Sequence, residues 1–167
     1  MRNFLSIKQM LIIYHGMCAS VLHYGILAWG GAKNNVINSL EILNKCVIKT
    51  IFNKPKLYST CKLYSECSLL SIKNQFTYQA ILYLIRNSEY KLCKHNVKTR
   101  LINKNYIFVP KIKKGNTVKS YEHHAKLHLN KLPVELRVNL LQSKTKNDFY
   151  EKMEKIKLSL INDQIIK

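Results

Sequence analysis

The chain has 167 residues, of which 47% are hydrophobic, which is enough for one domain with a packed core or for two small lobes. It contains no low-complexity tract and no repeat of about 20–50 residues, so a solenoid is excluded. Lysines and arginines number 28 against nine acidic residues, and the resulting net charge of +19 suits a polyanionic partner such as DNA or RNA.

The positive charge is concentrated in the middle of the chain. Residues 33–131 carry most of it, and only Glu41, Glu66, Glu89 and Glu122 oppose it there. This distribution favours an electrostatic footprint on a phosphate backbone. An alternative is that lysine, asparagine and isoleucine, which share A/T-rich codons, are frequent because of genome composition. Arginine is scarce, and lysine acts on phosphate as a point charge, so base-specific readout is not indicated.

Residues 4–28 are predicted to form a single helix with apolar residues on most faces. Burial in a protein core is the preferred interpretation. The alternative is a membrane anchor over residues 10–29, which the polar residues His15, Ser20 and His23 make less favourable.

Asn34 or Asn35 is predicted to cap a second helix that extends to about residue 53. Its expected apolar stripe is Val36, Ile37, Leu40, Leu43, Val47, Ile48 and Ile51. Lys45 and Lys49 are i, i+4 neighbours beside this stripe. They face either a nucleic-acid backbone or solvent.

A short helix over residues 60–66 and a longer one over residues 72–92, capped by Ser71, are expected next. The aromatic residues of the longer helix are spaced for core packing: Phe76, Tyr78, Tyr83 and Tyr90. A last amphipathic helix is predicted over residues 144–161, with Phe149, Met153, Ile156 and Leu160 on one face.

The segment 94–119 has a different character. Residues 106–109 are β-prone, Pro110 interrupts them, and residues 113–116 have the composition of a turn. A small basic β-hairpin or extended arm is expected here. Its lysines form the densest positive cluster and the first choice for phosphate contact, with a solvated loop as the alternative: Lys111, Lys113, Lys114 and Lys119.

The five cysteines share no regular spacing and no cleavable signal is evident, which favours reduced thiols and an intracellular location, cytoplasmic or nuclear. Cys93, His95, His123, His124 and His128 offer zinc-type ligands, but no Cys-x-x-Cys accompanies them. We therefore predict no metal and no cofactor.

Four sequence blocks, in their order and spacing, resemble the region after the palm of reverse transcriptases from non-LTR (LINE-type, Jockey-like) retrotransposons. They are residues 20–30 (SVLHYGILAWG), 43–51 (LNKCVIKTI), 63–72 (LYSECSLLSI) and 130–137 (NKLPVELR). The resemblance covers residues 11–137 and implies a mainly α fold, a helical thumb-like bundle that grips a template–primer duplex. Where the family usually has an arginine on the second thumb helix, this chain has Cys46.

Catalysis is not expected. A polymerase palm holds two metal ions between clustered carboxylates, usually of aspartates. This chain has only two aspartates, Asp148 and Asp163, and they are not adjacent in the sequence. Asp148, Glu151 and Glu154 recur at i, i+3 spacing, which is typical of a solvated helix face.

We thus expect a helical thumb-like domain over residues 1–93, a basic arm and post-thumb segment over 94–143, and a C-terminal helix over 144–167. The expected function is sequence-independent binding of an RNA or DNA template–primer duplex, with an intact reverse transcriptase palm as a further candidate partner and with no small-molecule substrate. The alternatives are the membrane-associated protein described above and a decayed element product without function.

Overall fold

The computed structural model of the chain describes residues 5–88, 90, 92, 106–110, 120–143 and 145–162. The fold of these residues is mainly helical, as predicted. The described residues contain no β-strand, only an isolated antiparallel bridge between Leu92 and Ile107. The predicted β-hairpin is therefore not supported, and most of the predicted arm lies outside the described residues.

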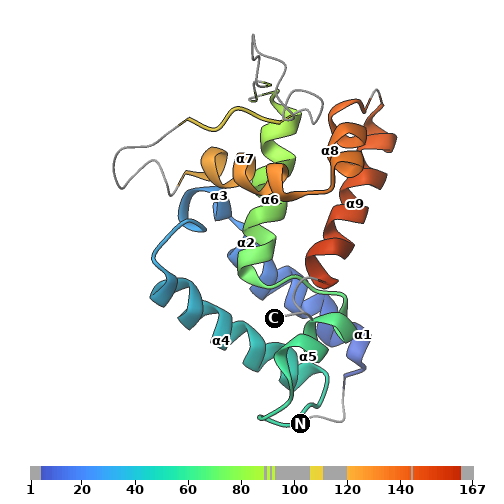
Figure 1. Cartoon of the computed structure of the whole chain (residues 1–167). Coiled ribbons are helices and arrows are strands. Elements are labelled where there is room, and N and C mark those ends of the chain that lie inside the picture. Colours follow the sequence, from blue (N-terminus) through green and yellow to red (C-terminus); the bar gives the residue numbers. More distant parts are fainter. Residues whose placement is uncertain are drawn as a thin grey trace. The chain divides into compact units, whose positions relative to one another are not determined.

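The chain forms two compact units, which we call unit 1 (Met1–Gln75 with Leu160–Lys167) and unit 2 (Phe76–Ser159). Figure 1 shows the helices of both. Unit 1 contains α1 (Ile7–Ile13), the π-helical segment η1 (Tyr14–Ala19), α2 (Ser20–His23), α3 (Ile26–Trp29), α4 (Asn34–Ile51) and α5 (Thr60–Cys67). Unit 2 contains most of α6 (Ile72–Arg86), α7 (Tyr121–Lys131), α8 (Val134–Leu141) and most of α9 (Lys146–Asn162).

The predicted single helix over residues 4–28 is interrupted. A capping box between Ser6 and Gln9 begins α1 at Ile7. The helical run ends after α2 because Gly25 takes a φ of 62°, a left-handed conformation that residues with a Cβ adopt at a cost. The indole N–H of Trp29 donates to the Tyr24 carbonyl over 2.9 Å, which satisfies a backbone group at the end of the helix. The first sequence block, residues 20–30, therefore forms two short helices joined by a turn at Gly25.

This N-terminal helical run is apolar on most faces, and it is buried on one side only, which is less than the predicted burial in a protein core. Tyr14 and Ala19 belong to the core, whereas Ile12, Met17 and Val21 are 71%, 69% and 71% exposed. Among the described residues, no helix combines the length and the apolar character needed to cross a bilayer.

α4 also departs in detail from its predicted pattern. Lys33, not Asn34 or Asn35, occupies the N-cap position. Three of the seven residues of the expected stripe are exposed, namely Val36, Leu43 and Val47, with Leu43 at 64%. The buried face instead includes Ile48 and Asn44, because Asn44 finds a polar partner inside the core and can replace an apolar residue there.

Two groups of polar contacts join the helices of unit 1. The Tyr14 hydroxyl donates to Asn44 Oδ1 over 2.9 Å in the core. The two oxygens of Glu41 accept the Tyr64 hydroxyl, at 2.5 Å, and the backbone N–H of Ile72, at 2.8 Å. Burial, followed by the nearby Glu41 charge, raises the pKa of Tyr64 far above its ordinary value, so the hydroxyl remains a donor. Glu41 thereby links α4 to α5 and to the first turn of α6.

α6 begins as predicted and ends early. Ser71 Oγ accepts the backbone N–H of Asn74 at 3.3 Å, which confirms the predicted cap. The helix ends at Arg86 rather than near residue 92, and Ser88 then takes a φ of 54°. Of the aromatic residues expected in the core, Phe76 is buried, whereas Tyr83 is 39% exposed.

In unit 2, the side chains of Asn130 and Arg137, which we call the Asn130–Arg137 clamp, hold the segment 106–110. Asn130 pairs with both backbone groups of Ile107, accepting its N–H and donating to its carbonyl, each at 2.9 Å. Arg137 is buried, donates to the carbonyls of Leu129 and Asn130 at the end of α7, and lies 4.6 Å from the centre of the Tyr106 ring. The first and last residues of the fourth sequence block, Asn130 and Arg137, thus each bond to backbone groups of unit 2.

α9 confirms its predicted face, since Met153, Ile156 and Leu160 are buried. Two of its acidic residues pair with lysines one turn away, Asp148 with Lys152 at 2.6 Å and Glu154 with Lys157 at 3.6 Å. Such i, i+4 and i, i+3 pairs are typical of an outer helix face.

Replacing Arg137 by Ala should lower the free energy of unfolding by at least about 2 kcal/mol, because two charge-assisted bonds to the end of α7 are lost in a buried site. Arg137→Lys should be nearly as damaging, since one ammonium cannot replace a planar donor that also stacks on Tyr106. Urea unfolding would measure both. Arg86→Ala, at an exposed arginine, is the control and should change stability by about 0.5 kcal/mol or less. Equal losses at the two sites would contradict the clamp.

The stability of unit 2 should fall in mild acid because of His124. Its ring packs on Phe76 and His128, and its Nε2 lies 3.1 Å from Thr77 Oγ1. Burial first, and then the neighbouring cations, lower the pKa of His124 from 6.5 to about 4. Between these values the unfolded chain binds a proton that the folded chain excludes. The contribution is therefore fully present above pH 6.5 and decreases by up to about 3 kcal/mol as the pH falls to 4.

Urea unfolding at a series of pH values should show this decrease in the native protein and a smaller one in His124→Gln. The difference between the two curves isolates His124 from the carboxylates that titrate nearby. Parallel curves would show that His124 is not the titrating group.

Candidate nucleic-acid interface

The end of α4 turns the chain back beside the helix. Asn53 takes a φ of 51°, its N–H donates to the Thr50 carbonyl at 3.3 Å, and the Lys54 N–H donates to the Lys49 carbonyl at 2.8 Å. This is the hydrogen-bond pattern of a Schellman motif, with asparagine in the left-handed position where glycine is more common. The turn brings Lys54 and Lys56 back to the C-terminal half of α4.

A groove of about 520 Å³ lies between α4 and this returning segment, and we call it the α4 groove. Its lining residues are Ile42, Lys45, Cys46, Lys49, Thr50, Asn53, Lys54 and Lys56. Lysine supplies half of this set and no acidic residue belongs to it. A concave surface with charges of one sign concentrates its field on the groove and attracts anions.

The lysines of the α4 groove differ in their surroundings. Lys54 is held by Glu66, 2.7 Å away, and lies 4.6 Å from the centre of the Tyr58 ring. The hydrogen bond to Glu66 raises the pKa of Lys54, and the same bond lowers the pKa of Glu66. Lys49 donates to the Lys56 carbonyl over 2.7 Å, which fixes the returning segment. Among the described residues, no acidic side chain forms an ion pair with Lys45, Lys49 or Lys56.

Of the predicted phosphate ligands, the structure places Lys45 and Lys49 together in the α4 groove. Lys111, Lys113, Lys114 and Lys119 lie outside the described residues. Lys54 and Lys56 were not predicted from the sequence as groove residues. A proline at position 55 indicates that α4 ends before it, but helical periodicity carries no information on the direction in which the chain leaves the helix.

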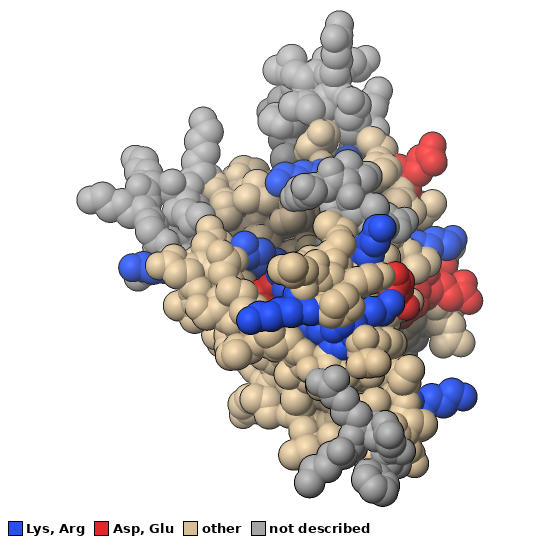
Figure 2. Space-filling view, turned by 90° about the horizontal axis from the view of Figure 1, so that it is seen from below, with Lys and Arg blue, Asp and Glu red and all other residues tan. Residues whose placement is uncertain are grey.

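Figure 2 shows one face of the molecule, on which lysine and arginine side chains gather and acidic side chains lie beside some of them. Ion pairs offset part of the positive charge of the chain, as between Lys54 and Glu66. Among the described residues that line the α4 groove, the only charged ones are lysines.

The residues considered for metal binding do not form a complete site in the part of the chain that is described. His124 and His128 have their ring centres 4.5 Å apart, and His124 is engaged with Thr77. Cys93 and His95 lie outside the described residues. No group of three or more potential metal ligands is found among the residues described.

The chain matches no protein-family model, no curated protein and no solved structure.

The shape of the α4 groove should depend on the left-handed conformation of Asn53. Asn53→Ala should destabilise the protein by about 1 kcal/mol, because a Cβ without a compensating polar group is strained there, whereas Asn53→Gly should be neutral or stabilising. Thermal unfolding monitored by circular dichroism would rank the three proteins. A glycine variant less stable than the alanine variant would contradict this account of the turn.

Proposed function

We propose that the α4 groove binds the phosphate backbone of a nucleic acid without reading its sequence and without catalysing a reaction on it. The observation that carries the proposal is the convergence of Lys45, Lys49, Lys54 and Lys56 on one groove whose described lining residues include no acid. Phosphate contacts of this kind supply most of the affinity in non-specific binding.

The geometry also favours backbone contact over base readout. Lysines act on phosphates as mobile point charges, whereas specific readout relies on side chains that form two bonds to a base edge. No arginine is found among the lining residues that the structure describes. The groove lies on the helix that the resemblance identifies as the second thumb helix, and the thumb of that family grips the template–primer duplex. The preferred ligand is therefore an RNA–DNA or DNA duplex, and a reverse transcriptase palm is the proposed protein partner.

Only part of the groove charge is available for a new anion. Lys54 already shares its charge with Glu66, and Lys49 uses one of its donors on the Lys56 carbonyl. An ammonium carries three N–H donors, so Lys49 still has donors for phosphate. Lys45, Lys49 and Lys56 consequently keep donors for phosphate, and Lys45 and Lys49 are the two of them that α4 itself supplies.

The salt dependence of duplex binding tests the proposal. The Lys45→Gln/Lys49→Gln double variant should reduce the log–log salt slope on B-form DNA by up to about 1.8, from about 0.9 per phosphate contact. The loss should be the same on unrelated sequences. Fluorescence anisotropy with a labelled duplex at several salt concentrations would measure it.

Two further variants sharpen the test. Lys152→Gln/Lys155→Gln removes the same charge from α9 and should alter the slope much less. Cys46→Arg adds a cation to the groove and should raise the slope by about 0.9 while tightening binding. Equal slopes for the two glutamine pairs would leave only diffuse attraction by the net charge and would overturn the proposal.

The predicted arm is tested in the same assay. If Lys111, Lys113, Lys114 and Lys119 contact phosphates, changing all four to Gln should lower the slope by up to about 3.6. A large effect of these changes, combined with no effect in the α4 groove, would move the interface from the groove to the arm.

A further inference from the structure

Unit 2 contains a second concavity of about 400 Å³, which we call the α8–α9 pocket. Its lining residues are Ile85, Arg86, Ser88, Tyr90, Leu140, Leu141, Ser143, Thr145, Phe149 and Tyr150. The volume falls within the range of about 300–1,000 Å³ that is usual for small-molecule sites. All of its described lining residues belong to unit 2, and none of them lines the α4 groove.

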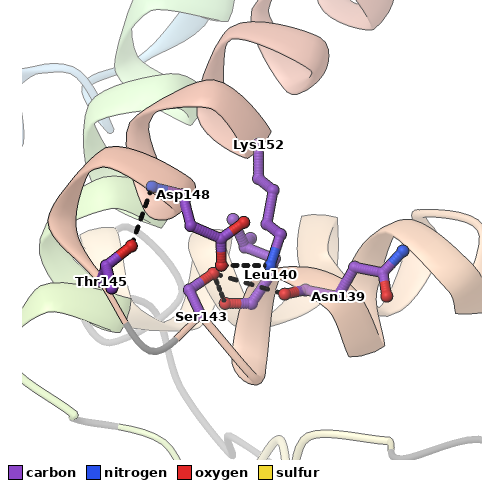
Figure 3. Close-up of polar contacts among 6 residues, drawn as sticks. All are labelled: Asn139, Leu140, Ser143, Thr145, Asp148 and Lys152. Carbon is purple, nitrogen blue, oxygen red and sulfur yellow. Dashed lines mark hydrogen bonds and ion pairs between the residues drawn. The ribbon is translucent and has the colours of Figure 1, made fainter.

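The connection between α8 and α9, which forms one wall of the pocket, is held by its own hydrogen bonds (Figure 3). Ser143 Oγ donates to the Leu140 carbonyl at 2.8 Å, and Thr145 Oγ1 accepts the Asp148 N–H at 3.3 Å as the cap of α9. The Thr145 hydroxyl still carries its own proton, and Ser143 Oγ retains lone pairs. Both hydroxyls are thus positioned by these hydrogen bonds and can still form a hydrogen bond with a ligand.

The lining combines three kinds of chemistry. Aromatic rings come from Tyr90, Phe149 and Tyr150, and the last two meet edge to face with ring centres 5.7 Å apart. Arg86 supplies the only charge among the described lining residues, and it is positive. Aliphatic side chains and hydroxyls complete the surface. A planar ring joined to an anion through a group that carries hydroxyls satisfies all three.

We propose that the α8–α9 pocket binds a single nucleotide, with its base against the aromatic side chains and its phosphate at Arg86. Base stacking on aromatic rings tolerates any sequence, and a guanidinium forms paired bonds to phosphate oxygens. The nucleotide is either free in solution or an unpaired residue of a bound strand. The inference does not depend on the α4 groove, which contacts phosphates without an aromatic surface.

The test uses the full chain with adenosine monophosphate as the probe, with ribose 5-phosphate and adenosine as its two halves. Ligand-detected NMR and calorimetry should show that the whole nucleotide binds more tightly than either half. Arg86→Gln should weaken binding about tenfold, and Tyr150→Leu about fivefold or more. Tyr150 is 49% exposed, so its replacement should leave the fold intact.

Matched controls are available elsewhere on the surface. Lys155→Gln removes an exposed cation, and Tyr24→Leu removes a tyrosine that is 85% exposed, both outside the pocket. Neither should change the affinity. A Lys45→Gln/Lys49→Gln protein that loses duplex binding but retains the nucleotide would show that the two sites are separate.

A duplex with a short single-stranded overhang distinguishes the two sources of the nucleotide. If only the overhang, and not the free nucleotide, responds to Arg86→Gln and Tyr150→Leu, the pocket receives a residue of a strand. The proposal would be overturned if ribose 5-phosphate bound as tightly as the nucleotide, or if the two control variants lost as much affinity as the pocket variants. Failure of the protein to bind both adenosine monophosphate and the overhang would also overturn it.

Discussion

Glu41 makes the contact on which unit 1 depends most. Its carboxylate accepts the Tyr64 hydroxyl and the Ile72 N–H, so one side chain of α4 fixes α5 and the first turn of α6. The Ile72 N–H is a donor at a helix N-terminus, where a negative charge is stabilising. With Asn44 held by Tyr14 one turn further along, the orientation of α4 about its own axis is determined by polar contacts as much as by its apolar residues.

This orientation decides what the remaining faces of α4 can do. With Asn44, Ile48 and Ile51 buried, Lys45 and Lys49 are left at the edge of the core, beside the segment that the Schellman turn returns. A chain with a charge of +19 experiences self-repulsion, and bringing lysines together in one groove increases it. The Lys54–Glu66 pair and the bond from Lys49 to the Lys56 carbonyl reduce this cost locally. The charge that is left in the groove is the basis of the proposed backbone binding.

Unit 2 is organised by side chains that satisfy backbone groups. Arg137 and Asn130 bond to carbonyls and to an N–H that have no helical partner, as Ser143 and Thr145 do between α8 and α9. Polar residues that act in this way resemble functional residues in a sequence, because both are placed at fixed spacings from turns. Arg137 ends the fourth block of the family resemblance, and it is buried. The proposed nucleotide pocket instead uses Arg86, which no motif had marked.

The sequence by itself determined the helical class, most helix positions, the Ser71 cap and the placement of Lys45 and Lys49 on one face of α4. These features follow from periodicity and from interactions within a few residues. Only the tertiary structure decided that Asn44 belongs to the core, that Leu43 does not, and that Lys54 returns to line the groove. Burial of a polar residue depends on a partner distant in the chain, here Tyr14, and the direction of a turn depends on one backbone angle at Asn53. Neither the burial of Asn44 nor the direction of the turn at Asn53 leaves a periodic signal in the sequence. The aromatic and cationic residues of the α8–α9 pocket come from α6 and α9 and the segments beside them, so their meeting was likewise a product of the fold.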